Sequence, residues 1–131
     1  MKGIGQKLML AFILLSTLGC MTIKAGAYKS FKVSIYVRAY EVDKMKDIHW
    51  LDSTWSVISS QLDVDKIYLE THRDLLIVDD NTLNQAKEFF HAKGIETAGG
   101  ITYTIDESNS FETFCYSNPE HRKTVQEIAE H

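Results

Sequence analysis

The fold class follows from three stretches of the chain: FKVSIYVRAY (residues 31–40), KIYLET (66–71) and IETAGGITYT (95–104). Each is short and rich in β-branched or aromatic residues, which is typical of β-strands. A segment with helical spacing of apolar residues follows each one. Strands that alternate with helices predict an α/β fold with a parallel sheet. Three such units would be the first three of a TIM-type (β/α)8 barrel, where about 250 residues are usual.

The first strand shows a clear two-residue alternation. One face carries the apolar set Phe31, Val33, Ile35, Val37 and Ala39, and the other face carries Lys32, Ser34, Tyr36, Arg38 and Tyr40. Successive side chains of a strand point to opposite faces of the sheet. We therefore expect the apolar set to face the surrounding helices and the second set to face the barrel interior.

The helices are predicted from their capping residues. Asp52 or Ser53 would cap a helix that runs to about Gln61, after a loop over residues 41–51. Residues 79–82 (DDNT) would begin a second helix that ends before Gly94. Residues 117–120 (SNPE) would open a third, after a polar loop over residues 106–116.

Three further details complete the secondary-structure prediction. Residues 75–78 (LLIV) form a short strand or a turn, and Gly99-Gly100 indicates a bulge or a close approach of two backbones. The third helix is still running at His131, without a cap or a glycine. We therefore expect the barrel to be truncated after its third unit.

The first 27 residues have the pattern of a signal peptide. Lys2 and Lys7 precede an apolar run over residues 8–23, and Ala25-Gly26-Ala27 then predicts cleavage before Tyr28. This divides the chain into a signal peptide (1–27) and a partial barrel domain (28–131). Alternatively, Leu18-Gly19-Cys20 resembles the end of a lipoprotein signal, with Cys20 lipidated. Both readings predict an exported protein: periplasmic, extracellular or anchored to the outer membrane.

Composition excludes several classes of function. The chain has a formal charge of −4, and removing the leader with its three lysines leaves 11 basic and 18 acidic residues, a charge of −7. This argues against a nucleic-acid partner, and against any membrane contact other than through the signal or a lipid anchor. The histidines lack metal-ligand spacing, and no phosphate-binding loop or serine elbow is present, so we expect no metal and no cofactor. Cys115 is interpreted as a small, partly buried apolar residue.

Four segments resemble a known family. KVSIYVRAYEV (32–42), DKIYLETHRD (65–74) and AKEFFHAKGIETAGGITYTI (86–105) resemble the first three strand units of a bacterial (β/α)8-barrel glycoside-hydrolase-like family. FCYSNPEHRKTVQEIAEH (114–131) resembles the segment that leads to its fourth strand. The resemblance implies a barrel that acts on a carbohydrate outside the cytoplasm, with an essential carboxylate at the end of the fourth strand. It therefore assigns no catalytic residue to this chain.

Barrel enzymes place their functional groups at the carboxyl ends of the strands. Three clusters meet this condition, one after each predicted strand: Arg38, Tyr40 and Glu41; Glu70, His72, Arg73 and Asp74; and Thr102, Tyr103 and Asp106. We predict that six of these residues bind substrate: Arg38, Tyr40, Glu70, His72, Arg73 and Tyr103.

The middle cluster allows two interpretations. A carboxylate, an imidazole and a guanidinium within five residues can hold sugar hydroxyls by charge-assisted hydrogen bonds. The simpler interpretation is a local salt bridge from Arg73 to Asp74 or Glu70. Arg38 would also need a partner, and Glu70 on the adjacent strand could supply it. Five aromatic residues could stack on sugar rings or belong to the core: Tyr36, Tyr40, Trp50, Tyr103 and Phe111.

The sequence therefore predicts the amino-terminal part of an exported glycoside-hydrolase-like protein, which contributes part of a carbohydrate-binding cleft and is inactive alone. Its complete mechanism would be acid/base hydrolysis with two carboxyl groups. The alternative is a small secreted or lipid-anchored α/β protein that binds a ligand without catalysis.

The two interpretations of the leader can be separated by mass spectrometry of the mature amino terminus. Cleavage after the small residues at 25–27 predicts an unmodified chain that begins at Tyr28. A chain that begins at an acylated Cys20 would contradict this prediction and establish a lipid anchor.

Overall fold

The computed structural model describes Tyr28 and residues 30–131. The predicted signal peptide and the possible lipidation site at Cys20 lie outside the described residues. Within the described part of the chain, no helix is both long and apolar enough to cross a membrane.

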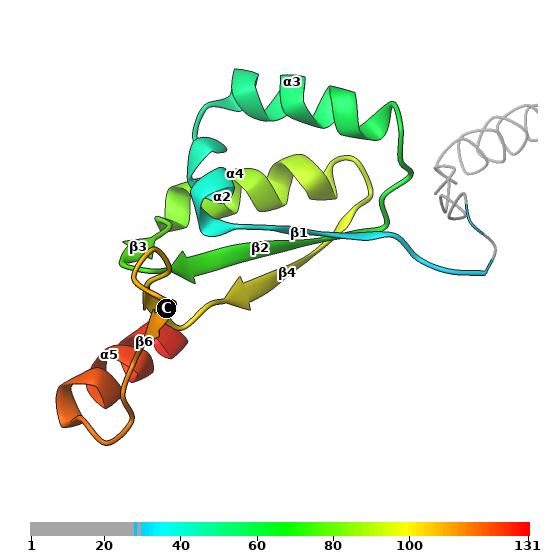
Figure 1. The fold of residues 1–131 in the computed structure, drawn as a ribbon. Helices are drawn as coiled ribbons and strands as arrows, with labels where there is room; N and C mark the ends of the chain where they lie inside the picture. The colour runs from blue at the N-terminus through cyan, green and yellow to red at the C-terminus, as the bar shows by residue number, and fades with distance from the viewer. Residues whose placement is uncertain (1–27, 29) are drawn as a thin grey trace, which may run out of the picture.

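The centre of the fold is a small, mainly parallel sheet (Figure 1). Strand β2 (Lys66–Arg73) lies between β1 (Ser34–Val37) and β4 (Glu96–Ile101), and both neighbours run parallel to it. The short strand β3 (Leu76–Ile77) turns back and pairs antiparallel with the end of β2. The α/β prediction is confirmed, and the parallel strands follow one another in chain order. The outer edges of β1 and β4 have no partner strand among the described residues.

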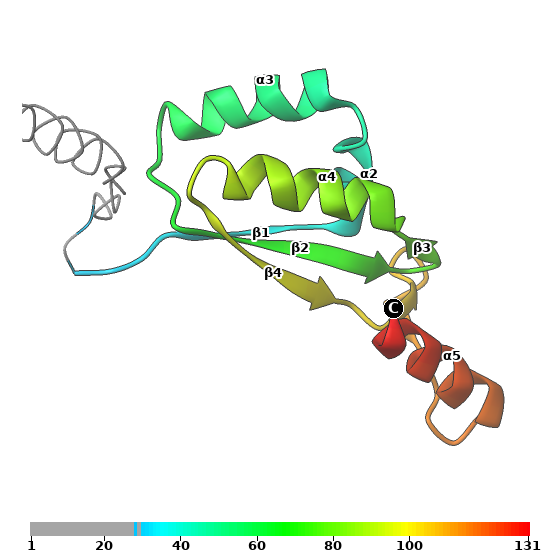
Figure 2. The same ribbon diagram turned by 180° about the vertical axis from the view of Figure 1, so that it is seen from behind.

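Helices cover one face of this sheet (Figure 2). α2 (Ala39–Lys44) and α3 (Ile48–Ser59) follow β1, and α4 (Asp80–His91) follows β2. After β4 the chain forms a hairpin of β5 (Thr104–Asp106) and β6 (Glu112–Thr113), and then α5 (Pro119–Glu130). The hairpin and α5 lie beyond the carboxyl ends of the parallel strands (Figures 1 and 2).

The core lies between the sheet and the helices. Ile67 and Leu69 of β2 are buried against Phe90 of α4, whose ring meets Trp55 of α3 edge-on at 5.3 Å between centroids. The expected alternation of β1 is confirmed from residue 32 to residue 40: the odd-numbered positions are buried or half-buried and the even-numbered ones are exposed. Phe31 departs from the pattern, because it is exposed before the strand begins.

Helix starts are the first point of difference from the sequence prediction. The expected loop over residues 41–51 is wrong, because α2 begins at Ala39 and α3 begins at Ile48. Asp47, rather than Asp52 or Ser53, caps α3 by accepting hydrogen bonds from the backbone N–H groups of His49 and Trp50. By contrast, the predicted starts of α4 and α5 and the glycine that follows α4 are confirmed.

Strand ends are the second difference. β1 and β4 are shorter than predicted, whereas β2 continues to Arg73, so that Glu70 and His72 lie within the strand. The pairing of β2 with β4 shifts by one residue at Thr71, which is a β-bulge. Gly100 pairs with Glu70 at this point, and a Cβ at Gly100 would lie 2.8 Å from the ring of Tyr36. The approach to Gly100 is thus made by a side-chain ring rather than by a second backbone, and the bulge lies in β2, opposite the glycine, rather than in β4.

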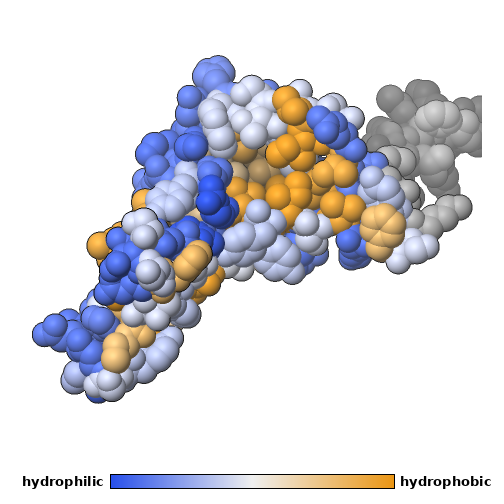
Figure 3. Space-filling model, in the orientation of Figure 1, coloured by the Kyte–Doolittle hydropathy of each residue, from blue (hydrophilic) through white to orange (hydrophobic). Residues whose placement is uncertain are grey.

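An apolar groove remains open between α3 and β1 (Figure 3). Its volume is about 170 Å³. It is lined mainly by apolar side chains of β1, α2, α3 and the core: Ile35, Val37, Met45, Trp50, Leu51, Trp55, Ile58, Ile67 and Phe90.

The close approach at Gly100 gives a stability prediction. Gly100→Ala would push the Tyr36 ring away and break its hydroxyl hydrogen bond to Glu70, so we expect a loss of about 1–2 kcal/mol in the free energy of unfolding. Urea denaturation of the full chain measures this loss.

The neighbouring glycine provides the control. A Cβ at Gly99 meets nothing within 4 Å, so Gly99→Ala should leave stability unchanged or slightly raised. In a Tyr36→Ala background, Gly100→Ala should cost little. A full loss in that background would show that the ring is not the cause.

Candidate functional site at the carboxyl ends of the strands

The carboxyl ends of β1, β2 and β4 meet at one end of the sheet, and the polar side chains predicted from the sequence gather there. Glu70 lies at their centre, in β2, and none of its side chain is exposed. A buried carboxylate is stable only if its oxygens receive hydrogen bonds.

Glu70 accepts hydrogen bonds from four parts of the chain. The Tyr36 hydroxyl of β1 donates to Oε1 at 2.7 Å, and the Ala39 backbone N–H, at the start of α2, donates to Oε2 at 2.7 Å. The Arg73 guanidinium binds both oxygens, through Nε at 2.7 Å and Nη2 at 2.8 Å. The Thr102 hydroxyl also donates to Oε1. One carboxylate thus connects β1, α2, β2 and the segment after β4.

These donors decide the charge state of Glu70. Burial alone would raise its pKa, but the hydrogen bonds from Arg73, Thr102, Tyr36 and the Ala39 amide outweigh that effect and lower the pKa below its ordinary value. Glu70 is therefore an anion with both oxygens engaged. Its described hydrogen bonds position its neighbours.

Arg38 and Arg73 both form salt bridges at this end of the sheet, and only the partner of Arg38 differs from our hypothesis. The hypothesis that Arg38 pairs with Glu70 is wrong: Arg38 is largely exposed and forms a salt bridge with Glu41 at 3.1 Å. Arg73 forms the local salt bridge with Glu70 that the sequence suggested, and it also contacts Glu107. These carboxylates raise the pKa of Arg73, so its charge is permanent.

Asp74 is a second centre of hydrogen bonds. It lies in the turn between β2 and β3 with a positive φ of 53°. The Tyr40 hydroxyl, the Thr104 hydroxyl and the Glu107 backbone N–H all donate to its carboxylate. Partial burial would raise the pKa of Asp74, but these donors lower it. Asp74 therefore holds the exposed ring of Tyr40 against the β2–β3 turn.

A shallow cleft of about 480 Å³ opens beside Tyr40 and Asp74, and we call it the Tyr40–Asp74 cleft. Segments that follow all three parallel strands line it: Tyr40, Asp74, Leu75, Leu76, Ile105, Asp106 and Glu112. In parallel α/β folds, ligands bind at the carboxyl ends of the strands. The cleft combines an exposed aromatic ring and aliphatic side chains with carboxylates.

His72 does not line the Tyr40–Asp74 cleft. Its side chain is buried, its Nδ1 lies 2.8 Å from the Thr71 hydroxyl, and its Nε2 has no hydrogen-bond partner. Burial and the nearby His131, whose ring centroid lies 5.0 Å away, lower the pKa of His72. A neutral, enclosed imidazole is a packing group, so the predicted substrate contact through His72 lacks an exposed surface.

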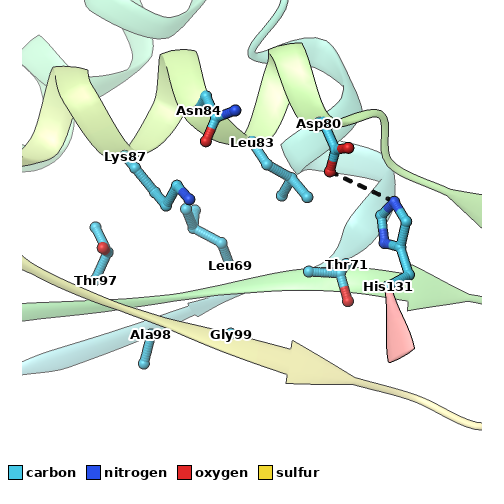
Figure 4. Close-up of a pocket in the computed structure, with 10 residues that line it drawn as sticks. All are labelled: Leu69, Thr71, Asp80, Leu83, Asn84, Lys87, Thr97, Ala98, Gly99 and His131. Carbon is cyan, nitrogen blue, oxygen red and sulfur yellow. Dashed lines mark ion pairs between the residues drawn. The ribbon is translucent and has the colours of Figure 1, made fainter. Parts of the chain in front are cut away.

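A second cavity lies on the helix-covered face of the sheet, between α4 and strands β2 and β4 (Figure 4). It has a volume of about 300 Å³. Asp80, Asn84 and Lys87 of α4 point toward it, and His131 closes one end with its Nε2 3.6 Å from Asp80. This cavity lies between sheet and helix rather than beyond the strand ends, so we consider the Tyr40–Asp74 cleft the better candidate.

The remaining predicted residues are dispersed. Tyr103 is half-buried between β4 and β5, Trp50 lines the apolar groove, and Phe111 is exposed in the hairpin. The expectation that Cys115 is partly buried is wrong: it is exposed, and Ser117 lowers the pKa of its thiol. No group of three or more potential metal ligands occurs in the part of the chain that the structure describes.

Sequence reasoning missed several residues of the cleft. The sequence prediction places Asp106 in a polar cluster but not among the substrate-binding residues, and it gives Glu112, Leu75 and Ile105 no role in binding. Their signal was weak, because the β5–β6 hairpin that brings Glu112 to the cleft needs positive φ angles at Ser110 and Phe111 rather than at a glycine.

Comparison with protein families decides the classification. A family described as the probable glycosyl hydrolase catalytic domain matches residues 21–131. This chain belongs to that glycosyl hydrolase family. The match agrees with the resemblance seen in the strand segments of the sequence. Neither the curated proteins nor the solved structures gave a match to the glycosyl hydrolase domain.

The buried Glu70–Arg73 pair gives a second stability prediction. Glu70→Gln removes the buried counter-ion of Arg73, which then keeps only its contact with Glu107, and we expect a loss of about 3 kcal/mol in the free energy of unfolding at neutral pH. Glu41→Gln removes an exposed pair with the same sequence spacing and should cost less than about 1 kcal/mol. Chemical denaturation of both variants compares them.

The same pair predicts a pH dependence. Because the folded state lowers the pKa of Glu70, its contribution is complete above the ordinary value of 4.5 and is lost as the pH falls through the lower folded value. The difference between wild type and Glu70→Gln should therefore shrink in acid below that value. A difference that stays constant there would contradict the assignment of Glu70 as a stabilising anion.

Proposed function

We propose that this glycosyl hydrolase domain binds a carbohydrate chain in the Tyr40–Asp74 cleft, as the amino-terminal part of an exported bacterial (β/α)8-barrel enzyme. The observation that carries the proposal is the convergence of segments after β1, β2 and β4 on one cleft. Sugar rings present apolar C–H faces and polar hydroxyls. The Tyr40 ring and Leu75 suit the first, and the carboxylates of the cleft can accept hydrogen bonds from the second.

The described carboxylates support binding better than hydrolysis. A general acid for glycoside cleavage needs a raised pKa so that it carries a proton near neutral pH. The local hydrogen bonds lower the pKa values of Glu70, Asp74 and Asp106 instead. We therefore propose that residues 28–131 alone bind a glycan without cleaving it. A small exported or lipid-anchored protein that only binds would use the same cleft.

A binding experiment on the full chain tests this proposal. Titration calorimetry with a panel of neutral oligosaccharides should detect binding to at least one member, and a reducing-end assay should detect no turnover. Tyr40→Ala should weaken that binding about tenfold, which corresponds to about 1.4 kcal/mol. Tyr40→Phe keeps the ring and should retain most of the affinity.

Tyr116 serves as the control, because it is also an exposed tyrosine but does not line the cleft. Tyr116→Ala should bind as the wild type does. Absence of binding across the panel, or an equal loss in the Tyr116 variant, would refute the cleft as the site. Turnover that survives purification would show that the chain completes its own acid/base pair.

A further inference from the structure

We propose that the Tyr40–Asp74 cleft selects glycans by charge: it favours sugars with a free amino group over neutral sugars, and it rejects sugars that carry a carboxylate. This inference rests on the proposed function, because it assumes that a glycan occupies the cleft. It adds the chemical class of sugar that the cleft accepts.

The first argument is the charge of the lining. Three carboxylates line the cleft, those of Asp74, Asp106 and Glu112. Among the described residues that line it, none is basic. A like charge brought to within a few ångströms of such a lining is repelled, and a positive charge is attracted.

The second argument is that the nearby cations are already neutralised. Arg73 binds both oxygens of Glu70 and also contacts Glu107. Arg38 places two guanidinium nitrogens on Glu41, at 3.2 Å and 3.1 Å. A glycan carboxylate that approached these guanidinium groups would have to share them with their internal carboxylates, which reduces its gain in charge–charge attraction.

The third argument is that two of the lining carboxylates remain ionised. Asp106 accepts hydrogen bonds from the side chain and backbone of Ser108 and from the backbone of Asn109, and these lower its pKa. Asp74 is held ionised by the donors described above. The negative potential therefore persists at mildly acidic pH, where an amino sugar is protonated.

The apolar part of the lining distinguishes this cleft from a plain acidic patch. Tyr40, Leu75, Leu76 and Ile105 contribute rings and alkyl groups beside the carboxylates. Leu75 is 77% exposed, so its alkyl group is accessible to a ligand in the cleft. A sugar that carries an amino group offers both a C–H face for these side chains and a positive charge for the carboxylates.

Three oligosaccharides with the same β-1,4-linked gluco backbone provide the test: tetramers of glucosamine, glucose and glucuronic acid. Titrations of the full chain at about pH 6 and low salt should rank their affinities in that order. The affinity should fall at least about threefold from the glucosamine to the glucose tetramer, and again from the glucose to the glucuronic acid tetramer. Added salt should reduce the differences, because it screens exposed charges.

Substitutions of the lining carboxylates test whether the cleft causes the preference for the amino sugar. Asp106→Asn and Glu112→Gln should each weaken binding of the glucosamine tetramer more than binding of the glucose tetramer, and so reduce the preference for glucosamine over glucose. Asp52→Asn is the control, because Asp52 is an exposed carboxylate on α3, outside the cleft. It should leave the order and the ratios unchanged.

The outcomes separate this inference from the proposed function. Equal binding of all three tetramers, or tighter binding of the glucuronic acid tetramer, overturns the charge selection and leaves glycan binding intact. If the neutral panel of the previous experiment and all three tetramers fail to bind, the proposed function fails and the inference fails with it. A preference for glucosamine that Asp52→Asn abolishes as fully as Asp106→Asn does would also overturn it.

Discussion

The structure depends on a buried negative charge. Glu70 is enclosed in β2, and a carboxylate in such surroundings is tolerated only with donors on both oxygens. The chain supplies them from β1, α2, β2 and the segment after β4. Elements that are far apart in the sequence are therefore fixed together by one side chain, at the end of the sheet where the cleft lies.

This arrangement also determines how the cleft is built. Arg38, at the cap position of α2, makes no side-chain capping hydrogen bond, and Glu70 instead binds the first backbone N–H of that helix, at Ala39. Tyr40 is the next residue along and reaches Asp74. The position of the exposed aromatic ring thus follows from the buried anion on the neighbouring strand. We regard Glu70 as the support of the site rather than as one of its contact residues.

The sequence predicted those features that depend on local chemistry. Asp79, Gly94 and Pro119 mark helix boundaries through caps and backbone preference, and the structure places the boundaries of α4 and α5 accordingly. The salt bridge between Arg73 and Glu70 was suggested by their nearness in the sequence, as a contact in a loop, and the structure forms it within β2 across the bulge at Thr71.

Features that depend on tertiary contacts were not predicted. The alternation of apolar and polar residues continues to Tyr40 and therefore did not predict that β1 ends at Val37. The strand ends there because a helix begins at Ala39, and that start is stabilised by Glu70, thirty-one residues away. Asp47 and Asp52 are equally good caps in isolation, and the chain uses Asp47. Cys115 was expected to be partly buried because it lies between two aromatic residues, yet only one of them, Phe114, is buried. The Tyr40–Asp74 cleft needed the hairpin geometry and could not be derived from spacing.

The open groove beneath α3 has a consequence for how the molecule moves. α3 spans a hollow on the β1 side, and its described aromatic contact with the core is that of Trp55 with Phe90. α4, in contrast, buries Thr82, Ala86 and Phe90 along its length. Segments with less buried apolar contact open at a lower free-energy cost than the rest of a domain. We therefore expect α3 to open locally more easily than α4, so that its backbone amides exchange with solvent before those of α4.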